Sequence, residues 1–253
     1  MTVFSVIIPT YNSHKTILRA LKSVVNQSFN DLEIIIVDDG STDNTKEIID
    51  SFFKDLKVKY TYIYQSNSGP SSARNKAIAN STGKYIAFLD SDDEWHIDKL
   101  KIQYNILCYY NVKFISTQYT IRDFQRQDDY NLKHYSFNDF LISNIAATPC
   151  TIIDKELFDK VGGFDEQLFY SEDYNLWLKI SREEPLLFID LPLTRLHKLP
   201  YGESGLSSNM WEMEKGELYN YKYCYNLKYI SFLKYHFLNI FSFLKYLKRL
   251  SLK

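Results

Sequence analysis

Three apolar stretches in the first ninety positions have the length and continuity of buried strands, and each ends in a polar cluster. They cover residues 3–8, 32–37 and 84–89. The clusters that follow are Pro9-Thr10-Tyr11-Asn12, Asp38-Asp39-Gly40-Ser41 and Asp90-Ser91-Asp92-Asp93. Between these stretches, apolar residues recur at helical spacing. Strands that alternate with helices predict βαβ units, and therefore an α/β fold whose mostly parallel sheet is flanked by helices.

The same patterns predict boundaries for individual elements. Ser13 is the expected N-cap of the first helix, Gly83 is expected to stop a helix over 71–80, and Pro192 is expected to break a strand over 186–196. One further helix is expected to begin after residues 41–43, and two others are expected over 97–107 and 171–184. Further strands are expected over 60–64, 112–121 and 148–153. The expected loops are 122–131 and 201–208, of which the second is expected to be mobile.

The polar clusters are expected to meet in one crevice, because open α/β sheets bind ligands outside the carboxyl ends of their strands. Five carboxylates would gather there, those of Asp38, Asp39, Asp90, Asp92 and Asp93. Such a group repels itself unless a cation joins it. The pattern therefore predicts a site for a divalent metal and for a ligand that the metal can hold, for which a diphosphate is the best chemical match.

The Asp90-Ser91-Asp92 sequence can divide two tasks between its carboxylates. One can bind the metal, while the other binds a ribose hydroxyl or a metal-bound water. Mg²⁺ and Mn²⁺ prefer oxygen ligands and keep positions open for phosphate. A solvated acidic turn is the alternative, but the location directly after an apolar strand favours the functional interpretation.

Asp38 and Asp39 occupy a predicted strand-to-helix turn. A carboxylate there can accept hydrogen bonds from a nucleobase or a ribose, which we favour for at least one of the two. Turn formation and helix capping by Ser41 or Asp43 is the alternative, and both can hold together. The first cluster, 9–12, offers hydroxyls and an aromatic ring on which a base can stack, and an ordinary loop is its alternative.

Three further positions carry candidate chemistry. Arg74 falls near a helix start, where a cation opposes the helix dipole, so an anionic ligand explains it better than helix stability does. Glu172 or Asp173 can act as a general base, although acids in the first turn of a helix are also simply stabilising. His197 can be a third metal ligand or bind a phosphate oxygen, but a lone histidine usually does neither.

Composition narrows the class of protein. A hydrophobic content of 45% and a net charge of −1 over 253 residues indicate a packed core and argue against disorder. The three cysteines form no CxxC pattern, which argues against disulfides or a zinc site. We find no signal peptide and no apolar run of the roughly 20 residues that a membrane span needs.

The charge is unevenly distributed. Residues 218–253 contain no Asp or Glu and carry +7, so the remainder carries −8. This basic, aromatic segment has three interpretations: contact with an anionic membrane, which we favour, a homodimer surface, or a cap on the core. The acidic main body argues against nucleic-acid binding.

With these residues in view, the chain resembles the family 2 glycosyltransferases of the Rossmann-like GT-A fold. The resemblance extends from residue 3 to about 208. It rests on residues 6–12, 36–43, 69–70, 73–75, 88–93 and 162–166, together with Glu172-Asp173, residues 176–178, Arg195 and His197. The order and spacing of these motifs are far more specific than any one of them.

The resemblance implies transfer of a sugar, with inversion and with Mn²⁺ or Mg²⁺, from a nucleotide sugar to a glycan or lipid-linked acceptor. UDP is the favoured nucleotide. The implied donor-binding residues are Pro9, Thr10, Tyr11, Asp38, Asp39, Arg74, Asp90 and Ser91, the implied metal ligands are Asp92 and His197, and the implied base is Asp173, with Glu172 as the alternative. Family habit implies cell-surface polysaccharide synthesis, such as capsule or O-antigen, at the inner face of the cell membrane.

We accordingly predict a GT-A domain over 1–208, with a nucleotide-sugar half over 1–100 and an acceptor and catalytic half over 101–208, followed by an amphipathic helical extension over 209–253. Two other functions compete. A sugar nucleotidyltransferase would need a Gly-rich, Arg-containing loop where residues 9–12 lie. A non-catalytic nucleotide-sugar binding module would have no need of Asp173.

Overall fold

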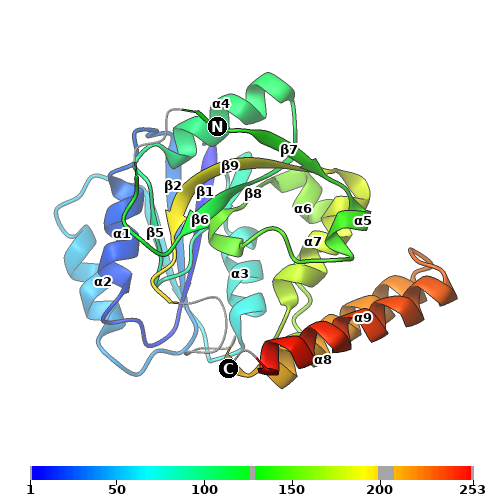
Figure 1. The fold of residues 1–253 in the computed structure, drawn as a ribbon. Coiled ribbons are helices and arrows are strands. Elements are labelled where there is room, and N and C mark those ends of the chain that lie inside the picture. The colour runs from blue at the N-terminus through cyan, green and yellow to red at the C-terminus, as the bar shows by residue number, and fades with distance from the viewer. Residues whose placement is uncertain (1, 126–128, 199–207, 252–253) are drawn as a thin grey trace.

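One twisted sheet runs through the molecule, and helices cover both of its faces (Figure 1). The computed structural model describes residues 2–125, 129–198 and 208–251. The N-terminal half of the sheet is parallel, in the order β3-β2-β1-β4. Its strands are β1 (Phe4–Thr10), β2 (Leu32–Asp38), β3 (Tyr60–Tyr64) and β4 (Tyr85–Phe88). The α/β prediction and the expected order of strands and helices in this half are confirmed.

The second half joins through antiparallel pairings. β4 pairs with β8 (Ile152–Asp154), which pairs in turn with β6 (Phe114–Thr120). β6 is parallel to β9 (Leu186–Arg195), and β9 also pairs with the short β5 (Glu94–Trp95) and with β7 (Leu132–Tyr135). Parallel pairing is therefore confined to the first four strands and to β6 with β9.

Two expectations for this half are wrong. Pro192 does not break β9; it lies opposite Gln118 where the register shifts, and a proline is tolerated at such an irregularity because no ladder hydrogen bond is required there. The expected strand over 148–153 begins instead as a 3₁₀ turn at Thr148–Cys150, and only its end forms β8.

The helices alternate with the strands. They are α1 (Ile17–Val25), α2 (Thr45–Phe53), α3 (Pro70–Ala79), α4 (Lys99–Tyr110), α5 (Phe137–Phe140), α6 (Lys155–Val161), α7 (Glu172–Glu183), α8 (Met210–Asn226) and α9 (Phe232–Ser251). Ser13 is not the N-cap of α1, because its carbonyl closes a turn that precedes the helix. Gly83 does not stop α3, which ends at Ala79 with Asn80 as its C-cap. Gly83 instead lies against β1, where a Cβ would come within 2.6 Å of the backbone nitrogen of Ser5.

Alternation along the strands divides the core between the two faces of the sheet. Ile7 and Ile35 face the side that holds α3, α6, α7 and α8, whereas Ile8 and Ile36 face the side that holds α1, α2 and α4. All four side chains are fully buried or nearly so. Burial on both faces explains why these strands read as continuous apolar runs in the sequence.

The C-terminal hairpin of α8 and α9 packs against the α/β core beside α7 (Figure 1). Tyr221 is fully buried and donates its hydroxyl to the Leu141 carbonyl at 3.2 Å, and the Asn220 amide donates to the Ser171 carbonyl at 3.0 Å. Helix α8 is thus part of the core. No helix of the described residues is long and apolar enough to cross a membrane.

Candidate active site

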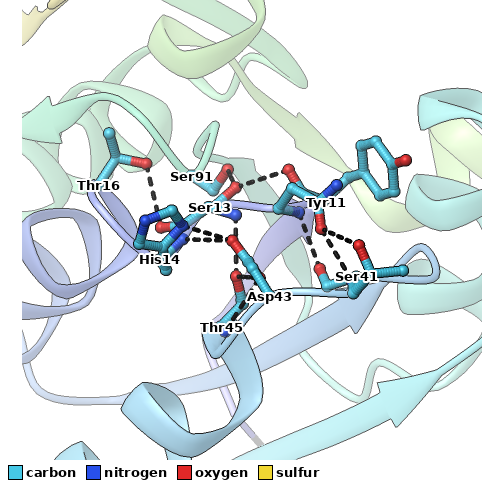
Figure 2. A network of polar contacts seen from close by, with 10 residues as sticks. Tyr11, Ser13, His14, Thr16, Ser41, Asp43, Thr45 and Ser91 are labelled. Carbon is cyan, nitrogen blue, oxygen red and sulfur yellow. Dashed lines mark hydrogen bonds and ion pairs between the residues drawn. The ribbon is translucent and has the colours of Figure 1, made fainter.

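The carboxyl ends of β1, β2 and β4 meet as predicted. Thr10 lies opposite Asp38 in the ladder, and the Asp39 backbone N–H donates to the Thr10 carbonyl at 2.8 Å. The Ser13 and Ser91 hydroxyls lie 2.8 Å apart, which joins the loop after β1 to the loop after β4 (Figure 2). Three polar clusters that are up to 80 positions apart in the sequence therefore line one edge of the sheet.

Hydrogen bonds between loops hold this edge in shape (Figure 2). The Asn12 N–H donates to the Ser41 hydroxyl at 2.9 Å, and the Asn12 side chain accepts from the Thr42 N–H at 2.8 Å. Burial alone would raise the pKa of Asp43, but hydrogen bonds from Thr45 and His14 lower it to about 2, so the carboxylate stays ionised. This arrangement preorganises the loops before any ligand arrives.

The two aspartates after β2 are engaged within the protein. Asp38 accepts from the Ser41 N–H and from the Tyr62 hydroxyl, at 2.8 and 2.7 Å. Asp39 accepts from the Gln65 side chain and from the backbone N–H groups of Ser68 and Gly69, at 2.7 to 2.8 Å. Both carboxylates therefore support the turn, as its chemistry predicts, and Asp39 also fixes the start of α3.

The first cluster presents its groups differently. Thr10 is buried, and its hydroxyl has no hydrogen-bond partner among the described residues. The Tyr11 side chain is 52% exposed, and its ring points away from the loop network in Figure 2. Pro9 is half-buried and lies opposite Val37 in the ladder. A free aromatic face beside an unsatisfied hydroxyl suits a nucleobase or another planar polar ligand.

Arg74 bridges the two halves of the crevice. Its guanidinium donates to Asp90 Oδ1 at 2.9 Å and to Glu172 Oε1 at 2.8 Å. Asp90 follows β4, whereas Glu172 opens α7, so one buried side chain ties the two walls together. The sequence interpretation, an anionic ligand for Arg74, overlooked these internal partners, because residues nearly 100 positions apart leave no local signal.

Ser171 places the two acids that follow it. It adopts a left-handed conformation with φ +56°, which is uncommon for a residue other than glycine. Its carbonyl accepts from Asn220 and its hydroxyl donates to the Met213 carbonyl at 3.2 Å, so α8 holds this strained residue in place. Glu172 and Asp173 therefore owe their position in part to α8.

The environments of these two acids differ. Burial raises the pKa of Glu172 to about 7, despite the opposing charge of Arg74. Burial also raises the pKa of Asp173, against hydrogen bonds from the Tyr174 N–H and the Asn144 side chain. Asn144 donates to Asp173 Oδ2 at 3.1 Å. This asparagine was missed in the sequence because it lies in a loop without a recognisable pattern.

The predicted metal ligands lie near one another along a second edge of the crevice. Asp92 pairs with Lys198 at 2.7 Å, and the next residue, Asp93, accepts from the His197 backbone N–H at 3.3 Å. The His197 Nε2 atom is buried without a hydrogen bond, 3.4 Å from Glu94 Oε1. Burial and the Arg19 charge lower the pKa of His197, which favours the neutral, metal-binding imidazole.

The donor set fits a divalent cation that shares its ligands with a substrate. Among the described residues, no group of three or more His, Cys, Asp or Glu is placed to hold a metal without help. Mg²⁺ commonly takes only one or two carboxylates and completes its shell with phosphates and water. Asp92 and the His197 Nε2 atom, which makes no hydrogen bond, match that arrangement.

Asp93 directly follows the Asp90-Ser91-Asp92 sequence, and the sequence pattern assigns it no role of its own. It is almost fully buried, and burial together with the charges of Asp90 and Asp92 raises its pKa to about 8. Its contact with the His197 backbone joins the loop after β4 to the end of β9. Asp93 therefore positions the segment that carries His197.

Comparison with known proteins agrees with this geometry. Residues 5–162 match the model of glycosyl transferase family 2. This match covers more than half of the chain, so the chain belongs to this family.

Particular relatives point the same way. An uncharacterized glycosyltransferase of Rickettsia conorii is 35% identical over 77% of this chain, which spans about a third of that relative's length, 33%. The Escherichia coli protein WfgD, named UDP-Glc:alpha-D-GlcNAc-diphosphoundecaprenol beta-1,3-glucosyltransferase, is 29% identical over 82% of this chain and 81% of its own.

Solved structures share the fold. Staphylococcus aureus TarS, in complex with UDP-GlcNAc, superposes with a TM-score of 0.71 at 22% identity, over 87% of this chain and 66% of TarS. The Pyrobaculum calidifontis mannosyltransferase PcManGT, with GDP-Man and Mn²⁺, gives 0.69 at 20% identity, over 88% and 64% of the two chains. The predicted GT-A architecture is confirmed.

Proposed function

We propose that this protein transfers a sugar from a UDP-linked donor to a hydroxyl group of a glycan or lipid-linked acceptor, with inversion and with the help of Mn²⁺ or Mg²⁺. The observation that carries the proposal is the Arg74 bridge, because it joins the donor-side Asp90 to the acceptor-side Glu172 and sets Asp173 beside both. The relative WfgD carries a UDP-linked donor and a β-linkage in its name, which supports both choices.

The donor lies across the ends of β1, β2 and β4 in this proposal. Tyr11 stacks on the base, and Pro9, Thr10 and the turn of Asp38 and Asp39 shape the nucleoside pocket. The Asp90 carboxylate and the adjacent Ser91 face the ribose, and Arg74 adds positive charge beside the diphosphate. The unsatisfied Thr10 hydroxyl supports this assignment, since a buried hydroxyl without a partner is costly.

Asp173 is the proposed base. It accepts the acceptor hydroxyl proton as that oxygen attacks the anomeric carbon, while the bond to the diphosphate breaks on the opposite face. Glu172 keeps Arg74 in place. Protonation of Glu172 would disrupt an ion pair, whereas protonation of Asp173 disturbs only hydrogen bonds from neutral groups.

Asp92 and His197 are the proposed metal ligands. A bound Mn²⁺ or Mg²⁺ would neutralise the charge that grows on the leaving diphosphate. Lys198, which now pairs with Asp92, is free to turn toward a phosphate oxygen once Asp92 is occupied. Asp93 holds the backbone of His197 throughout.

The proposed setting is the inner, cytoplasmic face of the cell membrane, where a lipid-linked acceptor for cell-surface polysaccharide would be available. The basic character of residues 218–253 supports contact with an anionic membrane surface. The lipid-linked acceptor in the name of WfgD supports the same setting.

A panel of UDP-, GDP- and dTDP-sugars tests the proposal by nucleoside diphosphate release, since slow donor hydrolysis requires no acceptor. We expect release from one UDP-sugar, with loss on addition of EDTA and in Asp92→Ala. Asp159→Ala is the matched control, because Asp159 is an exposed α6 residue that pairs with Lys155 at 2.9 Å, and α6 follows β8 beside the amino end of β4, not its carboxyl end. Failure of every donor to bind or to react with Mn²⁺ present would overturn the proposal.

A further inference from the structure

Helix α9 has its polar side turned toward the protein and its apolar side turned outward. On the inward side, Lys245 pairs with Glu217 at 2.6 Å and Arg249 pairs with Glu214 at 3.2 Å, both acids belonging to α8. The Ser242 hydroxyl also donates to Glu214, at 2.8 Å. Two of the cations that give residues 218–253 their positive charge are therefore neutralised within the hairpin.

The outward side is almost entirely apolar. Its large side chains are between 44% and 80% exposed: Phe232, Leu233, Phe237, Ile240, Phe243, Leu244, Leu247 and Leu250. At 3.6 residues per turn these positions fall within an arc of about 140° along the whole helix. Among the described residues, His236 and Ser251 interrupt this arc. We call the eight side chains the outer face of α9.

We propose that the outer face of α9 inserts into the surface of a lipid bilayer, with the helix parallel to the membrane plane. The inference rests on the proposed function, which places the enzyme at a membrane, and gives that contact a location and a driving force. Burial of apolar side chains holds the protein there, and basic charge plays the smaller part. The sequence favoured membrane contact for residues 218–253 without indicating which side chains make it, and the outer face of α9 supplies them.

The width and composition of the outer face favour a bilayer over a second copy of the chain. Leu233, Phe237, Ile240, Leu244 and Leu247 follow heptad spacing, but the apolar arc extends well beyond a two-stranded seam. Phenylalanines are spread along the helix, as in helices that lie at the boundary of headgroups and acyl chains.

Charge at the margin of the outer face is complementary to a bilayer that contains anionic lipid. Lys248 is exposed at one edge of the arc, and Lys222 and Lys228 are exposed on and just after α8. Residues 218–253 contain no acid that would repel the headgroups. Helix α9 has 20 residues in its described range but does not meet the requirements of a membrane span, so a surface orientation remains.

The hairpin also adjoins the acceptor side of the crevice. Gly216 of α8 lies so close to Tyr170 and Ser171 that a Cβ there would come within 2.6 Å of the Tyr170 carbonyl oxygen. These two residues directly precede Glu172. Figure 1 shows the C-terminal end of α9 at the same end of the molecule as the carboxyl ends of β1 and β4. A bilayer under α9 would therefore present a lipid-linked acceptor beside Asp173.

Removal of residues 218–253 would not test this proposal, because Asn220 and Tyr221 belong to the core. The double variant Ile240→Ser/Leu244→Ser changes only exposed side chains of the outer face. The matched control, Ile97→Ser/Tyr109→Ser, removes exposed apolar side chains elsewhere, 53% and 83% exposed respectively. Both variants and the unaltered chain would be floated with vesicles of phosphatidylcholine and phosphatidylglycerol.

We expect the unaltered chain to bind vesicles and to remain bound in about 1 M salt, where charges are screened within about 3 Å. The outer-face variant should partition roughly tenfold less or worse, and the control should match the unaltered chain. Release by salt, or an outer-face variant that binds as well as the control, would overturn the proposal. The proposal would also be overturned if the unaltered chain did not bind vesicles but formed a dimer, and the outer-face variant were monomeric.

Donor hydrolysis in detergent-free solution separates this proposal from the proposed function. We expect Ile240→Ser/Leu244→Ser to release nucleoside diphosphate from the soluble donor at the rate of the unaltered chain, because neither residue contacts the crevice. Vesicle binding without any hydrolysis would support insertion of α9 while rejecting the transferase assignment. Hydrolysis without vesicle binding would reject insertion alone.

Discussion

Individual side chains divide the work of the crevice, and the neighbouring acids Glu172 and Asp173 do so most clearly. Glu172 is committed to Arg74, whereas Asp173 is held by neutral donors such as Asn144. Burial raises the pKa of both acids, but only Asp173 can take a proton without loss of an ion pair. Two adjacent residues of similar chemistry thereby have different environments, and we predict different roles for them.

Asp173→Asn should lower kcat by roughly 10²- to 10⁴-fold, the usual contribution of a general base, while donor binding is retained. In the unaltered enzyme the rate should rise with pH through the pKa of Asp173, which burial holds above the usual aspartate range, because the base must be unprotonated. Steady-state kinetics of transfer across pH would measure both. A full rate in Asp173→Asn alongside an inactive Glu172→Gln would assign the base to Glu172.

Lys99 offers a prediction about stability. It is fully buried over the Trp95 ring, donates to Gln103 at 2.5 Å, and burial lowers its pKa from 10.5 to about 7. The unfolded chain therefore binds more protons than the folded chain between these two pH values, so stability should increase as pH rises from 7 to 10.5 and be lowest below 7.

Lys99→Met should remove that dependence. Compared with the unaltered protein, the variant should be more stable at pH 7 by roughly 1–3 kcal/mol, with most of the advantage gone at pH 10. Urea unfolding at both pH values would measure the difference. Parallel pH dependence in the two proteins would show that Lys99 is charged in the folded state at neutral pH.

Among the elements, those buried on two sides were predicted well from sequence, and those with little burial were not. β1, β2 and β4 are recognisable in the sequence as apolar runs, and the polar residues that follow each run indicate the position of the crevice. β5 has two residues and β7 is partly exposed, so neither carries a periodic pattern. The prediction that Pro192 would break its strand was wrong because β9 accommodates this proline at a register shift opposite Gln118. The register shift is visible only once the two strands are paired.

For the candidate site, the sequence predicted which segments come together but not the contacts between distant residues. The location of Asp90 and Asp92 beside the other strand ends was predictable, since that clustering follows from topology alone. The Arg74 bridge and the Asn144 contact connect segments far apart in the chain, so no local pattern encodes them. The inverted polarity of α9 was hidden because its cations are paired with acids of α8.

The contact of α8 with the start of α7 supports a prediction about these two elements. Gly216→Ala would place a Cβ within 2.6 Å of the Tyr170 carbonyl oxygen and 2.9 Å of the Ser171 hydroxyl, so α8 must move away from the start of α7. We expect a loss of stability of about 1–3 kcal/mol, with a reduced kcat because Glu172 and Asp173 follow directly. Lys215→Ala, at an exposed neighbour, is the control for thermal denaturation and kinetics; equal behaviour of both variants would contradict the prediction.

For the whole molecule, one sheet joins the donor and acceptor halves through the pairing of β4 with β8. We expect a single thermal transition, because neither half has a sheet of its own. A UDP-sugar with Mn²⁺ at about 100 times its Kd should stabilise the fold by about 2.7 kcal/mol and raise Tm by roughly 5–10 °C. Differential scanning calorimetry would measure both effects, and two separable transitions would contradict the first.

Arg74 would couple the binding free energies of the two proposed substrates. A donor that draws Asp90 toward its ribose weakens one of the two ties on the guanidinium, and the other tie, to Glu172, must respond. Under the proposed function, we expect occupancy of one substrate site to change the affinity of the other, by the same factor in both directions. We therefore expect non-additive binding, in which a bound donor changes the affinity of the protein for the acceptor.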